Sequence, residues 1–349
     1  MPPLKPSSMN SWNPDFSHLY IETGSEDTPL AKTVLERYPD AERIPVEDYR
    51  AIFNRPRQRF QQQKRSLKLI LARKKDHLIY PGSDNAQNFD TPNFFYVTPF
   101  LNCLYNCDYC FLQGMYSSAN LVLFTNQDAM VRALREVAAH PPEPHKPVFC
   151  AISYNTDLLA MEPWFGLSRF WIESTRDLAN LRIEIRSKSG NFRSLRDLPA
   201  SPHAILAWTL SPDAVFRQYE HGTAPPNLRI RAAAEAAQAG WPVRICIDPV
   251  LHIENWKEHY RGLIQNLFRS LPPERILDLS VGVFRMSAPY FKTIRSRQPA
   301  SDLYYAPFET ADGLVKYPDA LQAEMMGTIY EWLSDYLPPE RIGVWDSAD

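Results

Sequence analysis

The chain has 349 residues, and its 38 basic and 40 acidic side chains give a formal net charge of −2. This balance excludes a polycationic protein, while the length allows one large core or two modest ones. The first 14 residues are polar and no later segment stays apolar long enough to span a bilayer, so we expect a cytoplasmic protein that does not contact a membrane.

The basic side chains are concentrated in one early segment. Residues 55–75 contain nine lysines and arginines and no acid. Binding to a phosphate backbone needs such cations, which makes the segment a candidate nucleic-acid contact, although a solvated charged face is the plain alternative. Residues 66–72 have the pattern of a strand. We expect residues 1–90 to form an N-terminal extension whose basic segment packs on the following domain.

From residue 93 the chain alternates short β-branched or aromatic runs with longer helical patterns, which is typical of parallel βα units. An alanine-rich run that ends at Gly240 is the clearest helix, because glycine favours the left-handed turn that often follows one. The expected strands are 93–98, 147–153, 181–187, 204–209, 243–248 and 277–284. The expected helices are 128–140, 165–178, 227–239, 256–271 and 286–296.

Six parallel units without a closing pair predict an α/β fold, a partial TIM-like (β/α)6 barrel over residues 91–300. In such sheets the chemistry collects at the carboxyl ends of the strands. A last helix is expected at 319–337, so residues 301–349 would form a C-terminal appendage of a hairpin and a helix. No glycine- or serine-rich linker separates these three parts, and we therefore expect one catalytic domain with two appendages.

Three cysteines lie close together after the first of these strands. Cys103, Cys107 and Cys110 follow the spacing CxxxCxxC within a chain of five cysteines. Thiolates so spaced can each bind a different iron of one [4Fe-4S] cube and leave the fourth iron open for S-adenosylmethionine. A zinc site would want a fourth nearby ligand, and a disulfide would leave an odd thiol. With an aromatic residue before the last cysteine, the motif resembles the signature of the radical S-adenosylmethionine superfamily.

Within that superfamily the chain resembles the spore photoproduct lyases over nearly its whole length beyond the first forty residues. The resemblance rests on CLYNCDYCFLQ (103–113), YEHGT (219–223), AGWP (239–242), DPVLHIENWK (248–257) and DLSVGVFR (278–285). It implies a partial (β/α)6 barrel, one [4Fe-4S] cluster and S-adenosylmethionine. It also implies a lyase that reverts a thymine lesion in DNA through hydrogen abstraction by a 5′-deoxyadenosyl radical.

The resemblance also implies roles for individual residues beyond the three cluster cysteines. Tyr109 would lie beside the adenosyl group with a part in catalysis, and Lys188, Thr209 and Ser153 would contact the cofactor at strand ends. For Lys188, the alternative is a solvated lysine beside Gly190.

Two positions depart from the family pattern. Family members return a hydrogen atom from a cysteine at the end of the second strand, relayed by a tyrosine just after the last cluster cysteine. Ser153 or Tyr154 stands where that cysteine belongs, and Phe111 replaces the tyrosine. A phenol quenches a carbon radical more easily than a serine hydroxyl does, so Tyr154 is the better substitute. Cys150 is the other candidate. Strand alternation predicts that residues 150 and 154 share one face, but Cys150 lies deeper within the strand, and a buried free cysteine is commonly just a small hydrophobe.

Further candidates concern DNA. A lesion must leave the base stack to be reached, which calls for aromatic side chains near the barrel mouth. Such tyrosines can equally be packing residues, and lone histidines in loops more often hold the loops together. A second basic stretch after the last strand contains Arg285, Lys292, Arg295 and Arg297. The resemblance implies that a hairpin enters the duplex where Tyr304, Tyr305, Lys316 and Tyr317 lie. The loop or strand-end positions of the matched motifs contain His221, His252 and Glu254. Cys246 lies in an apolar run and is expected in the core.

The leading hypothesis is a radical S-adenosylmethionine lyase that repairs a pyrimidine lesion in DNA by direct reversal, reduced by a donor such as flavodoxin or ferredoxin. The missing hydrogen donor and relay tyrosine keep open a radical enzyme of the same fold with another substrate. A non-catalytic protein that binds damaged DNA is the second alternative. The motifs GxxxxGK[ST], GxGxxG and GxSxG are absent from the sequence, which removes the common rival enzyme classes.

Overall fold

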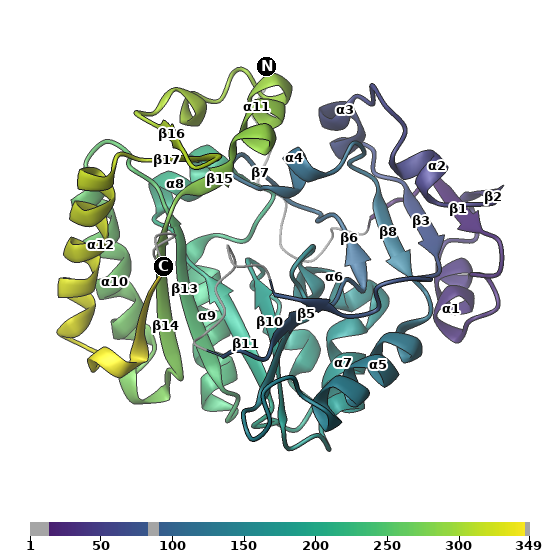
Figure 1. Cartoon of the computed structure of the whole chain (residues 1–349), viewed down its shortest axis with the longest axis horizontal. Coiled ribbons are helices and arrows are strands. Elements are labelled where there is room, and N and C mark those ends of the chain that lie inside the picture. The colour runs from purple at the N-terminus through teal and green to yellow at the C-terminus, as the bar shows by residue number, and fades with distance from the viewer. Residues whose placement is uncertain (1–13, 83–90, 346–349) are drawn as a thin grey trace.

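A computed structural model describes residues 14–82 and 91–345, and Figure 1 shows the chain. Within these residues a large sheet has the strand order β18-β14-β13-β11-β10-β9-β5-β4. Strands from β5 to β18 are parallel to their neighbours, and β4 is antiparallel to β5. All six predicted parallel strands are confirmed: β5 (Phe94–Tyr96), β9 (Val148–Ala151), β10 (Leu181–Ser187), β11 (Ala204–Thr209), β13 (Val243–Val250) and β14 (Asp278–Val283).

Two edge strands of the large sheet were not predicted. β18 (Ile342–Trp345) returns from the end of the chain and pairs parallel with β14, while β4 (Tyr80–Pro81) borders β5. Both are short, and neither has an alternating pattern long enough to separate a strand from a loop. The sheet curls into an open half-barrel, with helices along its outer face (Figure 1).

Each predicted helix is present within a few residues of its expected bounds. The expected helix at 165–178 is shorter because Gly166 adopts φ 63° and separates α6 from α7. Gly240 has φ 88°, the left-handed stop expected after α9. The helices are α5 (Gln127–Ala139), α6 (Leu158–Phe165), α7 (Leu167–Thr175), α8 (Asp213–Tyr219), α9 (Pro226–Gln238), α10 (Trp256–Ser270), α11 (Ala288–Arg297) and α12 (Asp319–Ser334).

A second, smaller sheet lies beside the β4–β5 side of the half-barrel, at the right of Figure 1. Its order in the described residues is β2-β1-β3-β8-β6, and β3 (Leu69–Ala72) confirms the strand expected at 66–72. β6 and β8 belong to residues 91–300, so this sheet combines strands from both sides of the domain boundary expected at residue 90. Its other strands and nearby helices are β1 (His18–Glu22), α1 (Pro29–Arg37), β2 (Glu42–Val46), α2 (Arg50–Phe53), α3 (Phe60–Lys64), β6 (Phe100–Leu101) and β8 (Leu121–Phe124).

The remaining short elements lie near the carboxyl ends of the barrel strands. β7 (Asn106–Cys107) pairs with β12 (Glu220–His221), and α4 (Leu112–Met115) contacts α11. A small antiparallel sheet contains β15 (Arg285–Ser287), β17 (Leu314–Lys316) and β16 (Glu309–Ala311), and the adjacent β16 and β17 form a hairpin. In the described ranges, no helix combines the length and apolar composition that crossing a bilayer requires.

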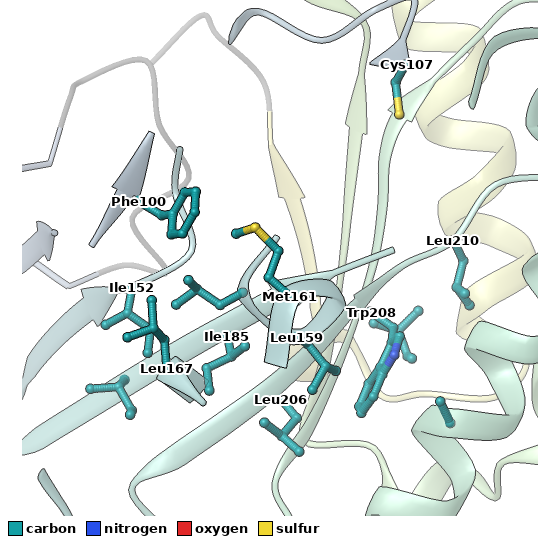
Figure 2. Close-up of a cluster of buried hydrophobic side chains, with 14 of the residues drawn as sticks. Phe100, Cys107, Ile152, Leu159, Met161, Leu167, Ile185, Leu206, Trp208 and Leu210 are labelled. Atoms are coloured by element: carbon teal, nitrogen blue, oxygen red, sulfur yellow. The ribbon is translucent and has the colours of Figure 1, made fainter. Parts of the chain in front are cut away.

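The main core fills the space between the large sheet and its helices. Figure 2 shows Ile185 of β10 and Leu206 and Trp208 of β11 close to Leu159 and Met161 of α6. The opposite, concave face of the sheet carries a smaller apolar cluster together with charged side chains. Alternation along the strands produces this separation. The fold therefore presents polar groups inside the half-barrel and at the carboxyl ends of its strands.

Candidate functional site

The cysteine loop connects β6 to α4 and starts at a backbone turn. Asn102 has φ 67°, a left-handed conformation that asparagine tolerates better than most residues. Its side-chain amide is buried and donates to the carbonyls of Ser118 and Asn120, both at 2.8 Å. These bonds tie the start of the loop to the chain segment that enters β8. The asparagine before the first cysteine therefore closes the base of the loop.

The three sulfurs of this loop are largely shielded from solvent. Cys107 is buried, Cys103 and Cys110 are partly buried, and none of the three is in a disulfide. Burial raises the pKa of Cys103 to about 12 and that of Cys107 well above its usual value. Thiolates in such surroundings need a compensating cation, and a bound metal deprotonates them outright. A donor set of three sulfurs on one loop, one buried and two partly buried, fits an iron-sulfur cluster.

No group of three His, Cys, Asp or Glu side chains in the described ranges is placed to hold a single metal ion. A cube makes a different demand, because each of its cysteines binds its own iron and the sulfurs stand further apart. The loop thus provides the ligand type and spacing that a cluster requires.

Tyr109 lies at the centre of a buried network on one side of the loop. Its hydroxyl donates to Glu220, and Glu220 forms an ion pair with the fully buried guanidinium of Arg229. Burial acts to raise the pKa of Glu220, but the charges of Arg229 and Lys188 outweigh it and hold the pKa below its usual value. The ammonium of Lys188 lies 5.3 Å from the centre of the Tyr109 ring. The structure therefore brings together Tyr109 and Lys188, the two residues that the family resemblance placed beside the cofactor.

Glu220 and Arg229 were not identified as site residues from the sequence. The motif YEHGT contains Glu220, but a single acid in a loop does not reveal its partner nine positions later. The structure pairs them because β12 brings Glu220 against Cys107 of β7, while α9 presents Arg229 at the same point. An arginine on the otherwise apolar face of an alanine-rich helix was the available signal.

The other predicted cofactor residues stand at neighbouring strand ends. Thr209 ends β11, and its carbonyl accepts from Arg229 at 3.1 Å. The Ser153 hydroxyl accepts from the backbone N–H of Arg186 at 2.7 Å. Asp157, missed from the sequence, is buried and accepts from the backbone N–H of Lys188 at 2.7 Å. These contacts fix the ends of β10 and β11 beside the cysteine loop.

Tyr154 lies close to the end of the cysteine loop. Its ring stacks on Tyr96, with centroids 4.5 Å apart, and lies 5.9 Å from the ring of Phe111, the residue after Cys110. Burial raises the pKa of Tyr154, while the charges of Arg186 and Arg285 act in the opposite direction. The proposed hydrogen donor and the aromatic residue that replaces the relay tyrosine are therefore neighbours.

Cys150 is placed differently. It is fully buried in the main core, whereas Tyr154 packs with Phe149 and Ala151 in the smaller cluster on the other side of the sheet. The expectation that residues 150 and 154 share one face is wrong, because β9 ends at Ala151 and strand alternation stops there. Cys246 is buried as expected, but its neighbours include the charged Arg186 and Glu184.

The tyrosines proposed to enter DNA have different environments. Tyr304 is buried and donates to the carbonyl of Asp108 at 2.8 Å, and the buried Tyr317 hydroxyl bonds the backbone N–H of His252. Both therefore have packing roles. Tyr305 is 63% exposed, and the guanidinium of Arg295 lies 5.0 Å from its ring centre. Of the tyrosines predicted for this role, Tyr305 is the one presented to solvent.

Comparisons with known proteins point to one family. The family model described as spore photoproduct lyase matches residues 12–342. The spore photoproduct lyase of Bacillus subtilis (strain 168) is 25% identical over 296 residues, which cover 82% of this chain and 83% of that protein. The spore photoproduct lyase of Geobacillus sp. (strain Y412MC61) is 21% identical over 275 residues, covering 75% and 80%.

Solved structures show the same fold. A spore photoproduct lyase variant with bound AdoMet and dinucleoside spore photoproduct superposes with a TM-score of 0.79 at 17% identity, covering 95% of this chain and 99% of the other. Another structure of a spore photoproduct lyase with the dinucleoside lesion superposes with a TM-score of 0.78 and the same coverage. The expected partial barrel is therefore confirmed, and the likeness to the solved fold extends over almost the whole chain.

Proposed function

Because the chain belongs to the spore photoproduct lyase family of radical S-adenosylmethionine enzymes, we propose that it reverts a spore photoproduct in DNA to two thymines by hydrogen abstraction and return. The observation that carries this proposal is the cysteine loop, which holds three free thiols, one buried and two partly buried, beside the Tyr109 network at the carboxyl ends of the barrel strands. This is the position where open parallel sheets bind their ligands.

The residues of this chain fit the cofactors that the family uses. Cys103, Cys107 and Cys110 would hold the [4Fe-4S] cluster. S-adenosylmethionine would contact Tyr109 and Lys188 beside the cysteine loop. It would also contact Thr209 and Ser153 at the strand ends. When bound, the cluster and S-adenosylmethionine supply a 5′-deoxyadenosyl radical for hydrogen abstraction.

The protein groups fix the geometry of that site. Glu220 accepts a hydrogen bond from the Tyr109 hydroxyl and is itself held by the ion pair with Arg229, which orients the Tyr109 ring. Asp157 holds the backbone of Lys188, so the ammonium stays over the Tyr109 ring. Catalysis of this kind depends on holding reacting atoms in a near-attack arrangement.

Tyr154 would return the hydrogen atom to the product radical. Its O–H bond breaks as the C–H bond of the thymine forms, which leaves a tyrosyl radical. The support is its place beside Phe111 and near two arginines, where its phenol faces the interior of the half-barrel. Cys150 is the second candidate, and its burial in the main core counts against it.

Several partners belong to the same proposal. Tyr305 with Arg295, and the outward-facing part of the 55–75 segment, would contact the DNA backbone. A low-potential donor such as flavodoxin or ferredoxin would reduce the cluster. A cytoplasmic location is supported by five free cysteines, since a reducing compartment preserves thiols.

The test is an anaerobic reaction of the reduced, reconstituted protein with S-adenosylmethionine and a dinucleoside spore photoproduct. We expect 5′-deoxyadenosine together with thymidylyl-thymidine, and the Cys107→Ala variant should make neither. Release of 5′-deoxyadenosine without thymidylyl-thymidine would instead indicate a different substrate for the same chemistry. Absence of both products from protein that binds the lesion would indicate a DNA-damage-binding protein.

A further inference from the structure

Helix α3, from the basic N-terminal segment, lies against the cysteine loop. The ammonium of its last residue, Lys64, donates to the carbonyl of Cys103 at 2.6 Å and to that of Tyr105 at 2.7 Å. Lys64 is thus joined to the first cluster ligand across 39 positions of sequence. A lysine counted among nine candidate DNA contacts points into the protein instead.

The contact is part of a wider brace. Gln61, also on α3, accepts from the Asn106 side chain at 2.9 Å and donates to Gln113 at 2.8 Å. Gln113 in turn donates to the carbonyl of Cys107 at 2.7 Å. The helix therefore holds the backbone of two of the three cysteines.

Packing keeps α3 in place. The Phe60 ring is buried, with the Arg297 guanidinium of α11 4.6 Å from its centre and the Lys64 ammonium 5.8 Å away on the same ring. Arg297 also donates to the carbonyl of Tyr116 at 2.8 Å. These neighbours hold the aliphatic part of the Lys64 side chain and so restrict the position of its ammonium group.

The neighbouring charge has a different environment. Arg65 follows Lys64 at the end of the helix, and its side chain is exposed. Lysine has three N–H donors, and Lys64 uses two of them on carbonyls of the cysteine loop. Burial lowers the pKa of Lys64, whereas negative charge on Cys103, Cys110 and Cys107 acts to raise it.

We propose that Lys64 is a positioning residue of the cluster site, which fixes the Cys103–Tyr105 turn and places a positive charge beside the cluster. The inference rests on the proposed function, since it requires that the three cysteines hold the cluster. A nearby positive charge stabilises the reduced, more negative state of a cluster over its oxidised state, and net charge and hydrogen bonding set cluster potentials. Lys64 would therefore make the cluster easier to reduce.

The test is a redox titration of anaerobically reconstituted Lys64→Met, followed by electron paramagnetic resonance of the reduced cluster. We expect the ratio of reduced to oxidised cluster at a fixed potential to fall about tenfold, a shift of about 59 mV for a one-electron couple. Lys64→Arg should titrate close to the unchanged protein because it keeps the charge and the donors. Arg65→Met, which removes an exposed charge one position away, should titrate like the unchanged protein.

The possible outcomes separate this inference from the proposed function. A Lys64→Met protein that titrates like the unchanged protein overturns the inference and leaves the cluster assignment intact. If Lys64→Met folds but takes up no iron, the titration is made on Lys64→Gln, which keeps donors without the charge, and an unshifted potential there overturns the inference. Failure of the unchanged protein to take up iron and sulfide would overturn the proposed function itself.

Discussion

The pair of Glu220 and Arg229 offers a quantitative test of how the site is held. Replacing Arg229 with methionine keeps the side-chain length but leaves the buried Glu220 carboxylate with the Tyr109 hydroxyl and the charge of Lys188. It also removes donors from the carbonyls of Ala224 and Thr209, at 2.6 and 3.1 Å. Breaking a buried ion pair by removing one partner costs about 3–5 kcal/mol. Because these carbonyl acceptors also lose their donors, we expect a cost in the free energy of unfolding of about 4–5 kcal/mol.

Removing the negative partner of the pair should cost less than removing the positive one. Glu220→Gln leaves the guanidinium of Arg229 with three neutral acceptors, so we expect about 3 kcal/mol. The double variant should be more stable than the sum of the two single costs predicts, because neither charge is then left buried alone. The assay is guanidinium unfolding of the cluster-free protein followed by circular dichroism. Additive costs, or a cost under about 1 kcal/mol for Arg229→Met, would refute the reasoning.

The same pair predicts a dependence on pH. The pKa of Glu220 is held below its ordinary value of 4.5, so its stabilisation is present above that value and is lost as the pH falls through the lower folded-state pKa. The stability difference between the unchanged protein and Glu220→Gln should therefore be constant near neutral pH and shrink in acid.

Three further outcomes are expected. Cys107→Ala should lose the broad visible absorbance of an iron-sulfur cluster after reconstitution, while the core variant Cys150→Ala should keep it; equal spectra would contradict the ligand assignment. Tyr154→Phe should release 5′-deoxyadenosine yet form at least about tenfold less thymidylyl-thymidine, about 1.4 kcal/mol in the barrier, and undiminished product would remove Tyr154 as donor. Hydrogen bonding to Asp108 raises the pKa of His221 above 6.5, so its stabilisation is full at lower pH and is lost as the pH rises through the folded-state pKa. His221→Ala should thus lower the melting temperature more at pH 6 than at pH 9, and an equal loss at both would disprove the pairing.

The sequence predicted the repeating part of the fold well. Each parallel strand from β5 to β14 has a β-branched or aromatic run, and each predicted helix has apolar residues at helical spacing. The local pattern was therefore sufficient to identify these elements. The short β18 was missed because its partner β14 lies more than fifty residues earlier in the chain, and such pairing leaves no local signal.

The sequence named the cluster ligands, which stay a prediction, and it missed several residues that support them in the structure. The cysteine spacing is a local pattern, and Tyr109 lies within it. Lys64 and Arg229 reach the site only through tertiary packing, and their sequence neighbours suggested a basic face and an apolar helix. For Cys150 and Tyr154 the local pattern misled, because the two residues are close in sequence but lie on opposite sides of the sheet once β9 has ended.

The cysteine loop is anchored at both ends in the small sheet, since β6 precedes it and β8 follows it as neighbouring strands. β8 in turn pairs with β3, from the N-terminal segment. The half-barrel is thus not a cassette that can be excised or transplanted alone. A chimera or minimal enzyme built from it must carry the N-terminal segment as well, or the loop will lack the scaffold that gives it shape.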